Sequence, residues 1–218
     1  MRPFTNTSRT MNSLRATLSA SVIRLRALPI SVGFAAWAIP ASAAPIVITH
    51  SGIGSGTLGT NTFVNADFTI TENADTANRQ SFINGFYIDD TSANIFINGL
   101  GTFSFTTGTR TFVEQFGMIV GFSQAGVNGM DLFDGPTNAV FSTWNMLTSV
   151  GPVSGNGMLL QWSLLPFTTT TGGQLTFDSA NAVPTVFTAA VVPEPAAVTL
   201  AALGLGGLAQ LRANRRRN

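Results

Sequence analysis

The chain has 218 residues, of which 10% are charged, against about 25% in an ordinary soluble domain, and it contains no cysteine. This composition excludes disulfides, thiol catalysis and thiolate-held zinc or iron–sulfur sites. All eleven cations are arginine, and only Arg79 and Arg110 lie between residues 44 and 192. The same stretch contains nine acidic residues, so its net charge is near −7 (2 − 9). Such a charge repels phosphate backbones and excludes nucleic-acid binding.

The first element in chain order is an N-terminal leader. Residues 1–26 carry five arginines and no acid, residues 27–39 form a largely apolar run, and Pro40 follows. Ala41 and Ala43 then place small side chains at the −3 and −1 positions of a cleavage site. This order predicts a signal peptide over residues 1–43, carried by the export translocon and cut by signal peptidase after Ala43. Translation starting at Met11 is an open alternative.

The next stretch, residues 44–192, alternates apolar and polar side chains with period two. The alternating segments are residues 68–71, 102–106, 116–122, 160–164 and 175–178, with further candidates at 82–88, 93–97 and 183–192. The pattern predicts an all-β fold, a single antiparallel sandwich or jelly-roll-like domain of about eight to ten strands. This domain is expected between an N-terminal signal helix and a C-terminal transmembrane helix.

Turn signals separate these segments. They are Asn84-Gly85, Asn98-Gly99, Asn128-Gly129, Asp134-Gly135-Pro136, Gly155-Asn156-Gly157 and Gly172-Gly173. Because the first pair lies inside 82–88, that segment is a candidate hairpin of two short strands. Residues 52–56 are rich in glycine and predict a turn-forming loop. The four threonines at 168–171 predict a loop or an exposed strand edge, with glycan attachment as the alternative.

Few residues in this stretch suggest chemistry. His50 is the only histidine, and no G-x-S-x-G elbow accompanies it. Residues 89–94 and 128–135 are oxygen-rich enough to suggest calcium, but neither matches the spacing of an EF-hand, and acidic turns on a solvated domain explain them equally well. Trp144 and Trp162 are candidates for a sugar-stacking platform or for the core. We expect no catalytic residue, metal site or cofactor, and therefore no enzyme.

The last element combines a proline-flanked acid, an apolar run and a basic end. Pro193, Glu194 and Pro195 precede the apolar residues 196–211. Four arginines follow at Arg212, Arg215, Arg216 and Arg217. Sixteen helical residues span about 24 Å, short of a hydrocarbon core of about 30 Å, and flanking arginines can reach the headgroups. The positive end predicts a transmembrane helix with the tail inside and the domain outside.

This terminal arrangement resembles the PEP-CTERM protein-sorting signal of Gram-negative bacteria over residues 193–218. The resemblance implies that an exosortase-type membrane transpeptidase recognises Pro193, Glu194 and Pro195 and cuts the tail near them. It also implies delivery to the cell surface or the exopolysaccharide matrix. An ordinary anchor that happens to carry two prolines is the alternative.

The expected organisation is thus a signal peptide (1–43), an extracytoplasmic β domain (44–192) and a sorting signal (193–218). The leading hypothesis is a non-enzymatic surface or extracellular-matrix protein. It would be anchored transiently in the inner membrane through residues 196–211, with the exopolysaccharide as a candidate partner. The alternative is a secreted module that binds carbohydrate or another ligand.

Overall fold

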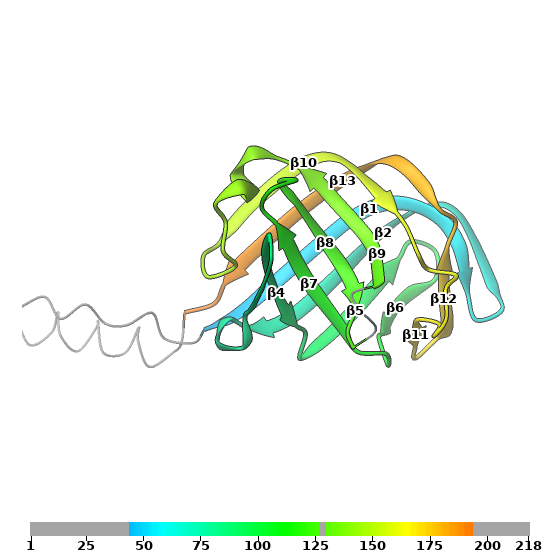
Figure 1. The fold of residues 1–218 in the computed structure, drawn as a ribbon. Coiled ribbons are helices and arrows are strands. Elements are labelled where there is room, and N and C mark those ends of the chain that lie inside the picture. The colour runs from blue at the N-terminus through cyan, green and yellow to red at the C-terminus, as the bar shows by residue number, and fades with distance from the viewer. Residues whose placement is uncertain (1–43, 127–129, 194–218) are drawn as a thin grey trace, which may run out of the picture. The chain divides into compact units, whose positions relative to one another are not determined.

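A computed structural model describes residues 44–126 and 130–193, which form the β domain of Figure 1. The strands are β1 (Pro45–Leu58), β2 (Asn61–Asp75), β3 (Gln80–Phe82), β4 (Gly85–Asp89), β5 (Ser92–Ile97), β6 (Gly101–Ser104), β7 (Thr109–Glu114), β8 (Ile119–Gln124), β9 (Met130–Thr137), β10 (Val150–Leu159), β11 (Thr169–Thr170), β12 (Gly173–Phe177) and β13 (Ala180–Val191). Two short 3-10 helices are η1 (Thr76–Asn78) and η2 (Ala139–Ser142).

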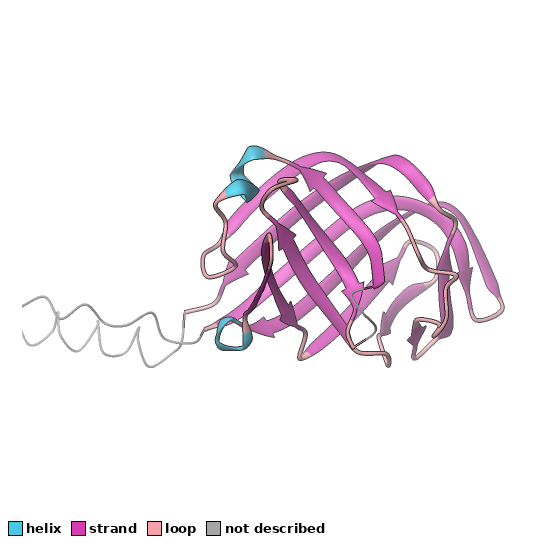
Figure 2. Cartoon of the chain, viewed as in Figure 1, coloured by secondary structure: helices cyan, strands magenta, loops and turns pink. Residues whose placement is uncertain are grey.

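The strands form one continuous antiparallel sheet in the order β3-β4-β7-β8-β9-β10-β13-β1-β2-β5-β6, with β12 also paired to β1 and β11 to β12. Figure 2 shows the sheet bending round so that its two halves face each other. The predicted all-β class is confirmed. The expected separate sheets of a sandwich or jelly roll are replaced by a single sheet, because strand pairing never breaks along the path. Register shifts in the β1–β2, β8–β9 and β10–β13 pairs mark bulges, which bend strands without ending them.

Several predicted segments are strands. Residues 68–71 lie in β2, 93–97 are in β5, and 175–177 are in β12. The last predicted strand is β13, and the 82–88 segment is the expected hairpin, with Phe82 paired to Gly85. The threonine run contains the short strand β11, whose backbone continues the edge beside β6 through hydrogen bonds such as Thr171 N–H to Ser104 O (2.8 Å).

Other local predictions were wrong. Residues 115–118 are the turn before β8, and residues 160–164 follow the end of β10. Three glycine-rich segments predicted as turns lie inside strands, namely residues 52–56 in β1, 134–136 in β9 and 155–157 in β10. Glycine marks close backbone approach there, since a Cβ at Gly157 would collide with the carbonyl oxygen of Asp134.

Two clusters of buried apolar side chains fill the space between the halves of the sheet. The first includes Phe68, Phe122, Phe133, Trp162 and Phe177. The second includes Ile46, Ile48, Phe141, Trp144 and Phe187. The strands that supply these side chains are far apart in sequence, so the core forms only when the sheet has bent.

Both ends of the β domain emerge side by side. Ile46 at the start of β1 pairs with Val191 at the end of β13, and Val192 N–H donates to Pro45 O (2.8 Å). Ala44 N–H donates to Thr76 Oγ1 (2.8 Å). Figure 1 shows the first and last coloured segments leaving the sheet together.

The predicted signal helix, the cleavage positions Ala41 and Ala43, Glu194, Pro195, residues 196–211 and the terminal arginines lie outside the described residues. Within residues 44–126 and 130–193, no helix combines the length and the hydropathy that a bilayer crossing requires.

Candidate functional site: the C-terminal sorting segment

The sorting segment begins where β13 ends. β13 is held on one side by β1 and on the other by β10, through pairs such as Val150 with Ala189, and Val191 N–H donates to Ser149 Oγ (2.9 Å). Val192 and Pro193 are exposed. Since proline has no N–H to donate to a sheet, Pro193 lies naturally just beyond the strand. The first motif residue is therefore accessible and separated from a rigid strand by one residue.

A second candidate is a polar pair inside the sheet. His50 of β1 and Glu72 of β2 are both 0% exposed, and Nε2 of His50 lies 3.4 Å from Oε1 of Glu72. The rings of Phe122, Phe133 and Phe187 surround the imidazole, with centroids 5.0–6.5 Å away. The imidazole nitrogens of His50 and the carboxyl oxygens of Glu72 have no hydrogen-bond partner among the described residues, so the 3.4 Å approach is a polar contact and not a hydrogen bond.

Burial decides the charge state of this pair. It lowers the pKa of His50 to about 3 and raises the pKa of Glu72 well above its usual value, with further raising by the nearby Asp90. An ion pair would require both charged forms, which burial disfavours. We therefore describe the two side chains as a neutral pair. Because aromatic rings enclose His50, no substrate reaches it in this conformation.

Several side chains of the oxygen-rich segments are engaged within the domain, whereas buried carboxyl oxygens of Asp90 and Asp134 have no hydrogen-bond partner among the described residues. Asp89 accepts a hydrogen bond from Nε of Arg110 (2.9 Å) and forms an ion pair with Nη2 of the same side chain (2.8 Å). Asn94 accepts a hydrogen bond from Ser104, and Asp131 accepts one from Ser123. In the described part of the chain no group of three or more histidine, aspartate or glutamate side chains is placed to hold a metal ion. Asn128 and Gly129 of the second segment lie outside the described residues.

The two candidate sugar-stacking residues belong to the core. Trp162 is 0% exposed and packs against Phe122 and Phe177, and Trp144 is 5% exposed and packs against Phe141 and Phe187. Neither indole face is open to a sugar ring. Of the two alternatives for these tryptophans, the core is confirmed and the sugar-stacking platform is wrong, because the curled sheet encloses both side chains.

The structure adds a surface feature that sequence reasoning missed. A polar hollow of about 450 Å³ is lined by Ala77, Asn78, Arg79, Gln80 and Asp89. Beside it, Tyr87 donates to Oε1 of Gln80 (2.7 Å) and lies under the guanidinium of Arg110 (4.3 Å). The available signal was that Arg79 and Arg110 are the only cations of residues 44–192. The hollow depends on the pairing of β3 with β4, and the two guanidinium groups lie over different residues of β4, that of Arg79 over Phe86 and that of Arg110 over Tyr87.

Comparison with known proteins identifies the C-terminal segment. The family model described as the PEP-CTERM protein-sorting motif matches residues 191–217, which include Pro193, Glu194, Pro195 and the four terminal arginines. No curated protein and no solved structure matches the chain. The match begins at the last residue of β13, so the domain passes directly into the motif. The chain thus carries a PEP-CTERM protein-sorting motif at residues 191–217, which supports export and sorting at the membrane.

Proposed function

We propose that this protein is a non-enzymatic component of the cell surface or extracellular matrix, released from a transient membrane anchor by an exosortase-type transpeptidase. The observation that carries the proposal is the sorting motif at residues 191–217, which starts at the end of β13. An enzyme that cuts near Pro193 meets an exposed segment and need not unfold the sheet. Cleavage there leaves β1 to β13 complete.

The surroundings of the ionisable groups support a non-enzymatic role. General acid–base catalysis needs a side chain within hydrogen-bond reach of its substrate. His50 and Glu72 are enclosed, and Asp89 is engaged by Arg110. The proposal is contradicted if the purified mature protein hydrolyses matrix polysaccharide and Glu72→Gln or Asp89→Asn abolishes that activity.

The sorting step is tested in the native host by replacing Pro193, Glu194 and Pro195 with alanine. The variant is expected to keep its tail and accumulate in the inner membrane, because the processing enzyme loses its recognition segment. The matched control is Thr199→Ala, which changes the apolar run and leaves the motif intact. Membrane fractionation and intact mass report the outcome. Normal release of the triple variant would refute the assignment.

The polar hollow favours a carbohydrate-binding module as a second candidate. Amide, guanidinium and carboxylate groups are the donors and acceptors that orient a polar ligand in a concave site. Asn78, Arg79, Gln80 and Asp89 supply these groups, and Tyr87 lies at the margin. This candidate uses the same export route and replaces the tryptophan platform with a different surface.

A glycan array probed with the mature protein tests this candidate. Asn78→Ala combined with Gln80→Ala is expected to weaken binding of any glycan hit at least about tenfold, as loss of two ligand hydrogen bonds implies. Gln161→Ala, an exposed glutamine beyond β10, is the matched control. Equal binding by both variants would remove the hollow as the site.

A further inference from the structure

Exposed apolar side chains gather at two places on the domain, one at the β3–β4 turn, the β7–β8 turn and η2, and the other in the loop before β11, with Leu164, Leu165 and Phe167. Ile83 in the β3–β4 turn is 96% exposed, and Phe116 in the β7–β8 turn is 87% exposed. Phe82, Met118 and Val140 are also exposed. We call these five residues the apolar rim. Side chains at turn tips are ordinarily polar, because water surrounds them on most sides.

The turns that carry the rim adjoin one another. Gln115 N–H donates to Asn84 O (2.8 Å), which joins the β7–β8 turn to the β3–β4 turn. Asn138 N–H donates to Met118 O (2.9 Å), which joins the β7–β8 turn to the segment before η2. The rim is therefore one surface and not a set of scattered side chains.

The turns that carry the apolar rim contain no charged side chain that would favour contact with water over contact with an apolar partner. Residues 82–85, 115–118 and 138–140 include no acidic or basic side chain. Glu114 precedes the second turn, and its carboxylate accepts hydrogen bonds from the backbone N–H groups of Phe116 and Gly117. This carboxylate is thus engaged by the turn itself. An uncharged, apolar surface suits an apolar partner.

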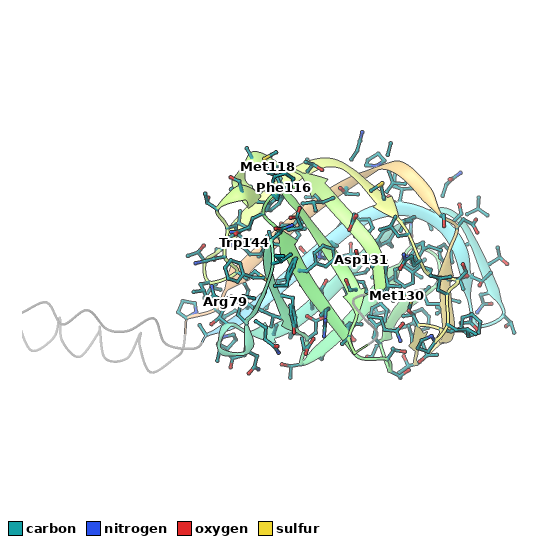
Figure 3. All side chains as sticks on the ribbon, viewed as in Figure 1. Arg79, Phe116, Met118, Met130, Asp131 and Trp144 are labelled. Carbon is teal, nitrogen blue, oxygen red and sulfur yellow. The ribbon has the colours of Figure 1, made fainter. Side chains whose placement is uncertain are left out.

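The rim lies at the end of the sheet from which both termini emerge. Ile119 at the start of β8 pairs with Thr137 at the end of β9. Along the sheet, β10 begins, β13 ends and β1 begins at this same end, since Val150 pairs with Ala189 and Ile46 with Val191. In Figure 3, Arg79 and Trp144 lie on the side from which the ends of the domain leave, Phe116 and Met118 lie at the top of the view, and Met130 and Asp131 lie on the opposite side.

The tether to the apolar tail is short. Residues 192–195 separate the end of β13 from the apolar run 196–211. Four residues extend over at most roughly 14 Å, at 3.3–3.6 Å per residue. When residues 196–211 occupy a bilayer, this end of the domain therefore lies close to the lipid headgroups.

We propose that the apolar rim is a lipid-binding surface that rests on the bilayer while the C-terminal tail is attached. This inference rests on the proposed function, because it requires the anchored stage of sorting. The rim inserts Ile83 and Phe116 into the interfacial region and holds the domain in one orientation. That orientation places Pro193 near the membrane surface, where a membrane-embedded processing enzyme acts.

The absence of cysteine makes this proposal directly testable, because one introduced cysteine is the only labelling site. The full chain is produced in a bacterial host without an exosortase, so that the tail is retained. It is then reconstituted in phosphatidylethanolamine–phosphatidylglycerol vesicles that contain spin-labelled lipid. Phe116→Cys and, separately, Ile83→Cys carry an environment-sensitive fluorophore.

Two further labels act as controls. Leu203→Cys reports whether the tail is in the bilayer. Leu165→Cys lies in an exposed loop (73%) at the opposite end of the domain, near β9, where Gln161 N–H donates to Asp131 O. We expect strong lipid quenching at position 203, at least threefold more quenching at 116 and 83 than at 165, and a blue-shifted emission at both rim positions.

The outcomes separate the two levels of the proposal. A quenched tail with equal, weak quenching at positions 116, 83 and 165 overturns the lipid-binding surface and leaves the sorting function intact. An unquenched tail overturns the anchored stage and the rim inference with it. Lipid-independent protection of position 116 that grows with protein concentration assigns the rim to a second copy of the chain and overturns the proposal.

Discussion

At His50 and Glu72 the sheet encloses two ionisable side chains in their uncharged forms. Neither side chain has a hydrogen-bond partner in the described part of the chain, and the 3.4 Å contact between His50 Nε2 and Glu72 Oε1 is the polar contact that partly offsets their desolvation. Removing one partner of a buried polar pair leaves the other without a polar contact and destabilises the fold. Replacing both partners by apolar groups of similar shape can leave the free energy of unfolding nearly unchanged. The stability of the domain is therefore sensitive to the pair as a unit.

Glu72→Leu is expected to lower the free energy of unfolding by about 1–3 kcal/mol, because His50 then has no polar neighbour. The double variant His50→Leu and Glu72→Leu should recover most of this loss. Urea denaturation at pH 7 measures both, and Glu72→Gln, which keeps the size and a polar group, is the matched control. Additive losses in the double variant would contradict the paired description.

Asp90 gives the domain a pH dependence. Burial is the main cause that raises its pKa from 3.8 to about 7. Between these values the folded state binds more protons than the unfolded state, so the contribution of Asp90 to stability is lost as pH rises from about 4 to about 7. His50 acts in the opposite direction, since its lowered pKa causes loss of stability as pH falls from 6.5 to about 3.

Asp90→Asn replaces a buried carboxyl group by an uncharged amide. The carboxyl group either stays protonated in the folded state or is buried as a charged carboxylate, which destabilises the fold. We expect this variant to be more stable than the parent at pH 8 by about 3 kcal/mol, with the difference shrinking toward pH 4. Asp89→Asn is the control, because its carboxylate is half exposed and its pair with Arg110 contributes little. A pH-independent difference for Asp90→Asn, measured by urea denaturation, would refute the burial argument.

At the scale of the strand, close packing of neighbouring backbones explains why glycine recurs inside β1, β9 and β10. Gly157 of β10 lies against Asp134 O of β9 and Thr185 of β13, so a Cβ there meets backbone on one side and a branched side chain on the other. Gly108, in the connection before β7, would make only an ordinary contact with Ala125 Cβ at 3.5 Å.

Gly157→Ala is therefore expected to lower the unfolding free energy by about 2–4 kcal/mol, in the range of overpacked core substitutions. Gly108→Ala should change it by less than about 1 kcal/mol. Thermal or chemical denaturation of both variants at one pH provides the measurement. Equal effects would mean that the sheet adjusts to a Cβ at the β9–β10 interface.

Strand location shows where sequence patterns succeed and fail. The Phe68–Ile70 and Ile95–Ile97 alternations predict β2 and β5 because apolar side chains face the core there. In β7 the buried positions include Thr109 and Thr111, whereas Phe112 is only half-buried, so polarity no longer marks the inner face. Phe116 was assigned to a strand although it lies in an exposed turn.

At the scale of the whole molecule, the start and the end of the β domain meet at one end of the sheet. Ala44 N–H donates a hydrogen bond to Thr76 Oγ1 (2.8 Å), and Thr76 N–H donates one to the carbonyl oxygen of Ala44 (3.0 Å). Cleavage after Ala43 would leave this residue as the first of the mature chain without disturbing β1.

The intact mass of the mature protein should therefore correspond to a chain that begins at Ala44. Ala43→Arg is expected to block removal of the leader, since signal peptidase requires a small side chain at −1. Ala35→Val, within the apolar run, is the control and should be processed normally. A mature chain that begins within β1 would contradict the predicted cleavage site.

The linear pattern of residues is enough to predict the C-terminal sorting motif and the all-β class of this protein. Sorting signals are linear patterns of charge, apolar length and small or proline residues, so neighbours in sequence suffice to define them. The all-β class likewise follows from period-two alternation along single segments.

The tertiary structure decided what the interior and the surface present. Trp144, Trp162 and His50 are enclosed by strands remote in sequence, and Ile83 and Phe116 are left exposed because the turns that carry them meet at one end of the sheet. Burial is a property of partners across a folded sheet. It therefore cannot be read from a segment alone.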